Sequence, residues 1–132
     1  LPQVDTILLV SDCSRRGVQA AGRLSEMIQD LKLGGFLAKG IGLVSLHFVI
    51  GFIALPVWKQ VEVGLIINRA PGGELNPGVR EEIDKYGMKL IGVVPHDDTV
   101  YAYDAEGKPS VTVPENSPVK QAVHKIFDSL TL

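Results

Sequence analysis

Polar side chains that can donate, accept or carry charge follow three apolar runs of this sequence. The clusters are SDCSRR at residues 11–16, NRAPGG at 68–73 and PHDD at 95–98. Together they offer carboxylates, an amide, guanidinium groups and an imidazole, which can hold a small polar ligand. A phosphate-binding glycine loop is not among them, because the sequence contains neither GxxxxGKS nor GxxxxGKT; in GGFLAKG the lysine precedes the glycine.

Each polar cluster comes at the end of a run with strand character. Residues 4–10, 61–67 and 88–94 are rich in Val, Ile and Leu without alternating polar residues, which is typical of parallel strands covered on both faces. Helical patterns or short helical turns follow, at about 15–31, 77–86, 101–103 and 118–130. This alternation predicts an α/β fold, a partial Rossmann-like, mostly parallel sheet with flanking helices.

Capping residues and apolar stripes mark these helices. Ser14 and Asn76 have side chains that favour the N-cap position, and Gly87 is suited to ending the second helix. The stripe predicted for the first helix is Val18, Ala21, Leu24, Ile28 and Leu31. The stripe predicted for the last helix is Val119, Ala122, Val123, Ile126, Phe127 and Leu130.

Parallel strands place their carboxyl ends at one edge of a sheet, and ligands bind in the crevice beyond that edge. We therefore expect the three polar clusters to lie along one edge. A structural explanation stays open for each single loop, because turns of α/β units are polar in any case. Asp12 or Ser14 can cap the helix that follows, and Arg16 can be a solvated charge.

Composition narrows the class of protein. The chain of 132 residues has a formal charge of -2, so it lacks the excess positive charge that is typical of proteins that bind nucleic acid or an anionic membrane. Its one cysteine, Cys13, cannot form an internal disulfide, and no Cys and His cluster has zinc spacing. With no signal peptide pattern, these features predict a cytoplasmic protein. Because the chain lacks an initiator Met and enters a strand almost at once, we expect it to be part of something longer.

An apolar segment at about 34–60 interrupts the α/β pattern. Removing it leaves the short helix-to-strand link of ordinary α/β units, so we interpret it as an insertion in one incomplete domain that spans 1–132. Residues 40–58 carry no formal charge and are just long enough to span a membrane. A single span would separate the flanking elements, so we favour an apolar hairpin or helix that is buried or faces a partner. A membrane-embedded loop and a sequence of non-native origin stay open.

Four stretches taken in order resemble a known family. They are VDTILLVSDCSRRGVQAAGRLSEMIQDL, VGLIINRAPGG, IDKYGMKLIGVVPHDDTVYAYDAEGKP and PENSPVKQAVHKIFDSL. They are similar to the C-terminal half of CooC-type ATPases, MinD/ParA-like P-loop proteins that help insert nickel into carbon monoxide dehydrogenase. The resemblance covers about four fifths of the chain and leaves out the middle.

This resemblance implies a nucleotide site. In the family, the Asn of NR and the Pro with its neighbours after the next strand surround adenine; carried over, these are Asn68, Arg69, Pro95, His96 and Asp97. An Asn carboxamide offers the donor and the acceptor that adenine pairs with at N7 and N6, and Arg69 could stack on the base or pair with Asp97. Asn68 could instead be a turn residue, and His96 stands where relatives often carry an acid.

The resemblance also implies what this chain lacks. It would bind ATP with Mg only when the P-loop half is supplied, and the family's switch aspartates and metal-binding Cys pair belong to that half. Carbon monoxide dehydrogenase or a similar metalloenzyme is the implied partner, and a homodimer is possible. We expect no catalysis by this chain alone. The rival interpretations are a non-enzymatic protein-interaction module, such as a decayed or split relative, and a membrane-anchored adaptor.

Overall fold

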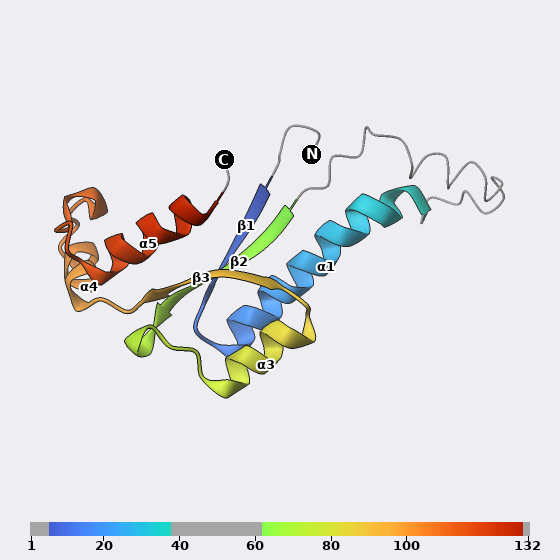
Figure 1. The fold of residues 1–132 in the computed structure, drawn as a ribbon, viewed down its shortest axis with the longest axis horizontal. Helices are drawn as coiled ribbons and strands as arrows, with labels where there is room; N and C mark the ends of the chain where they lie inside the picture. Colours follow the sequence, from blue (N-terminus) through green and yellow to red (C-terminus); the bar gives the residue numbers. More distant parts are fainter. Residues whose placement is uncertain (1–5, 38–61, 131–132) are drawn as a thin grey trace.

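The computed structural model describes residues 6–37 and 62–130, which form a three-stranded parallel sheet with helices on both faces (Figure 1). The strands are β1 (Thr6–Asp12), β2 (Glu62–Ala70) and β3 (Lys89–Pro95), and β2 lies in the centre. All pairings are parallel. The predicted α/β class and the partial Rossmann-like sheet are confirmed.

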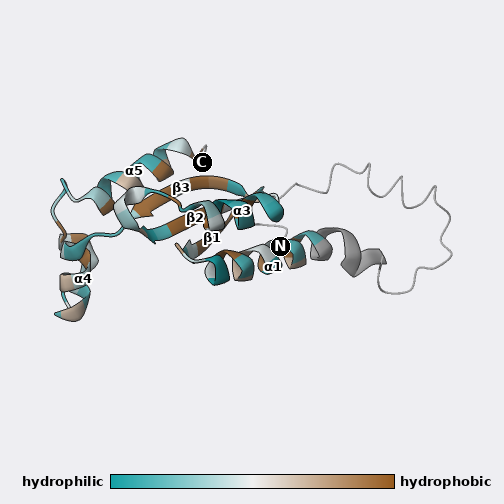
Figure 2. Cartoon of the chain, turned by 90° about the horizontal axis from the view of Figure 1, so that it is seen from below, coloured by the Kyte–Doolittle hydropathy of each residue, from teal (hydrophilic) through white to brown (hydrophobic). Residues whose placement is uncertain are grey.

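Two helices cover one face of the sheet and a third covers the other (Figures 1 and 2). Helices α1 (Arg15–Leu37) and α3 (Pro77–Lys85) pack together on the first face. Helix α5 (Pro118–Ser129) packs against β3 on the second. The fourth, α4 (Asp98–Ala105), follows the end of β3 and lies beyond the carboxyl edge of the sheet.

The main core lies between the sheet and the α1 and α3 pair. Its buried members are Val18, Ala21, Leu65, Ile67, Ala70, Val79 and Ile83. On the other face the contact is close because β3 carries a glycine: a Cβ on Gly92 would lie 2.3 Å from Cγ1 of Ile126 in α5. Helix α5 therefore packs closely on β3, while the residues of β2 that face the α1 and α3 side, Leu65 and Ile67, are fully buried.

Side-chain capping confirms two predicted helix starts. The Ser14 hydroxyl accepts a hydrogen bond from the Gly17 backbone N–H at 3.0 Å, and it donates to Oδ1 of Asp12 at 2.7 Å. Oδ1 of Asn76 accepts from the Val79 backbone N–H at 2.9 Å. The polar cluster after β1 thus holds the first turn of α1, which supports the capping interpretation of Asp12 and Ser14.

Two apolar residues assigned to buried stripes are exposed instead. Leu24 in α1 is 48% exposed and Phe127 in α5 is 52% exposed. After Val18, the buried positions described in α1 are the small residues Ala21, Gly22 and Ser25. Gly22 lies against the ring of Tyr86, where a Cβ would come within 2.4 Å. Leu24 lies off this buried line, because neighbouring positions on a helix point in different directions.

The predicted boundaries of α1 and β2 were too short. Helix α1 continues past Leu31 to Leu37, so it includes the first residues of the predicted insertion. Strand β2 continues past Ile67 to Ala70, which pairs with Pro95. Residues 38–61 lie outside the described ranges, so the hairpin and membrane-loop interpretations of 40–58 stay predictions. Among the helices that are described, none has the length and apolar character needed to cross a membrane.

Candidate functional site

The sheet register brings the three polar clusters to one edge, as the sequence predicted. Asp12 at the end of β1 is opposite Asn68 in β2, and Ala70 is opposite Pro95 at the end of β3. The backbone N–H of His96 also donates to the Ala70 carbonyl at 2.9 Å, which extends the pairing beyond β3. The ends of β2 and β3 are therefore held together.

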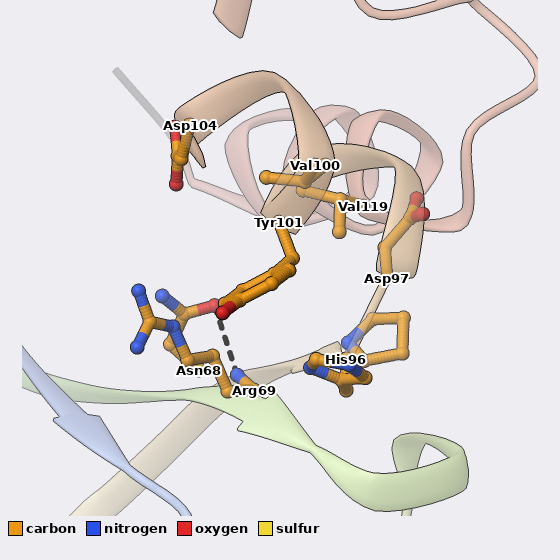
Figure 3. Close-up of a pocket in the computed structure, with 9 residues that line it drawn as sticks. Asn68, Arg69, His96, Asp97, Val100, Tyr101, Asp104 and Val119 are labelled. Carbon is orange, nitrogen blue, oxygen red and sulfur yellow. Dashed lines mark hydrogen bonds between the residues drawn. The ribbon is translucent and has the colours of Figure 1, made fainter. Parts of the chain in front are cut away.

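The second and third clusters line a cavity of about 290 Å³ at this edge (Figure 3). This volume is near the lower end of the roughly 300 to 1,000 Å³ of small-molecule pockets, so it suits one ring system better than a whole nucleotide. All five residues that the resemblance singled out line it. The complete lining is Asn68, Arg69, Pro95, His96, Asp97, Val100, Tyr101, Asp104 and Val119.

Four lining residues were missed by sequence reasoning. Val100, Tyr101 and Asp104 come from α4, and Val119 comes from the first turn of α5. The available signal was the position of the two tyrosines directly after PHDD, on a helix without a clear apolar stripe. The first polar cluster, in contrast, lies at the same edge but does not contribute to the pocket lining.

Asn68 and Arg69 lie in an irregular stretch of β2, where the register with β3 shifts between Ile67 and Ala70. Arg69 has a φ of 57°, in the left-handed region that non-glycine residues rarely adopt. Oδ1 of Asn68 accepts a hydrogen bond from the Arg69 backbone N–H at 2.9 Å, drawn as the dashed line in Figure 3. Because a backbone N–H can only donate, this contact identifies the carboxamide oxygen.

The orientation of Asn68 narrows what it can offer a ligand. Its oxygen already has a donor, so the group best placed to contact a ligand is the Nδ2 amide, which only donates. The sequence predicted that the carboxamide would offer a base both a donor and an acceptor. In the structure the Nδ2 donor is available, and Oδ1 can accept a further hydrogen bond only through its second lone pair. The turn role and the ligand role of Asn68 are compatible, since they use different atoms.

The Asp97 carboxylate accepts hydrogen bonds from residues at the starts of two helices. Its Oδ1 accepts from the Thr99 backbone N–H at 2.9 Å and caps α4, and its Oδ2 accepts from the Ser117 hydroxyl at 2.6 Å at the start of α5. No ion pair joins Arg69 to Asp97 among the residues in 6–37 and 62–130. Of the two roles considered for Arg69, stacking on a base stays a prediction.

His96 has a partner of its own at the rim. Its Nε2 lies 2.9 Å from Oδ1 of Asp98, and its side chain is 47% exposed. The His96 backbone N–H pairs with Ala70 of β2, and its exposed side chain lines the pocket.

The Ser117 hydroxyl is the main reason why the pKa of Asp97 lies below its ordinary value of 3.8; burial opposes this effect and the Thr99 N–H adds to it. A lowered pKa in the folded state stabilises the protein above pH 3.8, and this contribution disappears as the pH falls through the lower folded value. We predict that Ser117→Ala lowers the free energy of unfolding at neutral pH, and that its difference from wild type shrinks in acid.

Urea unfolding at several pH values measures this difference. Ser129→Ala is the matched control, because the Ser129 hydroxyl donates to the Ile126 carbonyl, which does not titrate. Its cost should stay constant with pH. A cost for Ser117→Ala that is equally constant down to strongly acidic pH would contradict the prediction.

No family model matches the chain. An uncharacterized ATP-binding protein of Methanocaldococcus jannaschii is 24% identical over 131 residues, which cover 96% of this chain and 40% of that protein. The cell division ATPase MinD of Pyrococcus furiosus superposes with a TM-score of 0.58 at 16% identity, over 94% of this chain and 41% of that one. The described fold is part of a MinD fold.

A second MinD structure gives the same result. The septum site-determining protein MinD of Pyrococcus horikoshii, solved in complex with Mg-ADP, has a TM-score of 0.56 at 17% identity and is covered to 39%. This chain thus spans about two fifths of the length of each of these proteins. The likeness to MinD is one of fold, and it does not distinguish a CooC-type protein from others with this fold.

Proposed function

We propose that this chain is the base-recognising part of a MinD-like ATPase. The observation that supports this most directly is the convergence of Asn68, Arg69, Pro95, His96 and Asp97 on one cavity. The resemblance to CooC-type ATPases implies that residues at these positions surround adenine. The carboxyl edge of a parallel sheet, where this cavity of about 290 Å³ lies, is the place where such sheets bind ligands.

Phosphate binding and catalysis belong, in this proposal, to residues outside this sequence. The chain has no P-loop motif, so nothing in it supplies the glycine loop and lysine that hold ATP phosphates. We propose that ATP and Mg bind when this part assembles with a part that carries such a loop. The chain contributes base contacts to that site and no catalytic group.

The cellular role of the complete ATPase is a more specific proposal. We propose, on the CooC resemblance alone, that it assists nickel insertion into carbon monoxide dehydrogenase or a similar metalloenzyme, acting as a homodimer. No group of three or more potential metal ligands occurs within the described ranges, and we place no metal site there. Nickel would be a cargo handled elsewhere in the assembly.

A protein-interaction module is the second candidate, and one observation favours it. Val10 on β1 is 64% exposed, and among the described strands β1 pairs only with β2. An apolar strand with an uncovered face is typical of a surface that another protein or another part of the fold covers. This candidate predicts no binding of bases, whereas the first predicts it.

Adenosine should bind this chain weakly, with a dissociation constant in the millimolar range, about -4 kcal/mol. Only the base contacts are present, so ATP should bind no more than a few-fold tighter than adenosine. Amide chemical shifts in an NMR titration measure both affinities, and the shifts should gather at 68–69 and 96–101. Micromolar ATP binding would contradict the assignment of phosphate contacts to another part, and unchanged spectra with adenosine would contradict the base pocket.

A further inference from the structure

We propose that Tyr101 is a stacking platform for a purine ring in this pocket, and therefore determines the class of ligand that enters it. This inference rests on the proposed function and adds a residue that the resemblance does not supply. Tyr101 projects from α4 toward the end of β2, where Asn68 and Arg69 form the opposite wall (Figure 3). All three residues line the cavity.

Comparison of the three tyrosines supports the assignment. Tyr86 packs against Gly22 of α1. Tyr103 is half-buried, with the Lys108 ammonium 5.3 Å from its ring centroid. Tyr101 is 68% exposed, and within the described residues it has neither a cation over its ring nor a hydrogen bond to its hydroxyl. Its ring is thus an aromatic surface that the rest of the described fold does not use.

The fold fixes the backbone of Tyr101. Its backbone N–H donates to the Asp97 carbonyl at 3.1 Å in the first turn of α4. That turn is capped by the Asp97 carboxylate, which also accepts from Ser117 of α5. Because the backbone of α4 is already held in place, ligand binding has to order only the side chain of Tyr101, and an aromatic side chain has few rotatable bonds.

The surrounding groups specify a flat ring with an acceptor at its edge. Val100 and Val119 give the pocket an apolar part, and the Nδ2 amide of Asn68 offers a donor. A purine has π-faces for stacking and ring nitrogens that accept hydrogen bonds. Its two fused rings also present more stacking surface than a pyrimidine, so purine nucleosides should bind more tightly than pyrimidine nucleosides.

Tyr101→Phe and Tyr101→Leu test stacking in the whole chain, since both are apolar but only Phe is aromatic. With adenosine as the probe in an NMR titration, Phe should keep the wild-type dissociation constant within about twofold, and Leu should raise it about tenfold. Tyr103→Leu is the matched control on the same helix and should leave adenosine affinity unchanged. Circular dichroism checks that each variant keeps its helices.

The outcomes separate the two levels of the proposal. Equal adenosine affinity of Phe and Leu, with shifts at Asn68 retained, overturns stacking by Tyr101 and leaves the base pocket standing. Wild-type spectra that do not change with adenosine up to roughly 10 mM overturn the base pocket and the stacking proposal together. A loss that is as large in Tyr103→Leu as in Tyr101→Leu, with both folded, also overturns the assignment to Tyr101.

Discussion

Replacing Asn68 with Asp should weaken adenosine binding about tenfold and leave the free energy of unfolding almost unchanged. Aspartate keeps an Oδ1 that accepts from the Arg69 backbone N–H, so the left-handed turn is preserved. It lacks the Nδ2 donor and places a carboxylate against the acceptor nitrogens of the base. NMR titration with adenosine and urea unfolding measure the two quantities.

Asn68→Ala is the companion variant, because it removes the ligand donor and the turn acceptor together. It should lose the same binding and, in addition, about 0.5 to 1.5 kcal/mol of stability through the unpaired Arg69 N–H. If Asn68 is only a turn residue, Asn68→Asp will bind adenosine like wild type and Asn68→Ala will change stability alone. That pattern would count against the base-site assignment.

Truncating Ile67 should have the largest effect on folding among these variants. Ile67 precedes Asn68 in the central strand and is 0% exposed, so Ile67→Ala should lower the free energy of unfolding by about 2 to 5 kcal/mol. Domains are stable by only about 5 to 15 kcal/mol in total, so this is a large fraction. Urea unfolding followed by circular dichroism measures the change.

Ile66→Ala is the control for this prediction. Ile66 has the same side chain and neighbours Ile67, but it lies on the opposite face of β2 and is only partly buried. Its truncation leaves a smaller cavity and should cost clearly less. Equal costs for the two variants would mean that the α1 and α3 side of the sheet does not hold the principal core.

Local patterns predicted the fold well where neighbouring residues determine the outcome. The apolar runs identified all three described strands, and the side chains of Ser14 and Asn76 located two helix starts, because a cap depends on residues within one turn. The gathering of polar clusters at one edge followed from parallel pairing alone. Leu24 was misplaced because the face that α1 buries depends on contacts such as that of Gly22 with Tyr86, which lies far along the chain.

The candidate site was predictable only in part, for a similar reason. The resemblance supplied residues from the ends of β2 and β3, but α4 and α5 complete the pocket with Tyr101 and Val119. The apolar stripe of the last helix included Val119 without showing that it lines a pocket, and α4 has no apolar stripe that indicates its inward face. The bond from Oδ1 of Asn68 to the next backbone N–H was also missed. Asn side chains commonly form hydrogen bonds with nearby backbone groups. A sequence pattern does not show whether a given Asn makes such a bond or binds a ligand.

The two hydrogen bonds of Asp97 have a mechanical consequence. One carboxylate joins the first turn of α4 to the first turn of α5, and these turns carry the pocket residues Val100 and Val119. Loss of the Ser117 hydrogen bond would uncouple these two turns, while the cap on α4 through Oδ1 would remain. Asp97 thus couples the position of the pocket residues in α4 to that of α5, which packs against β3.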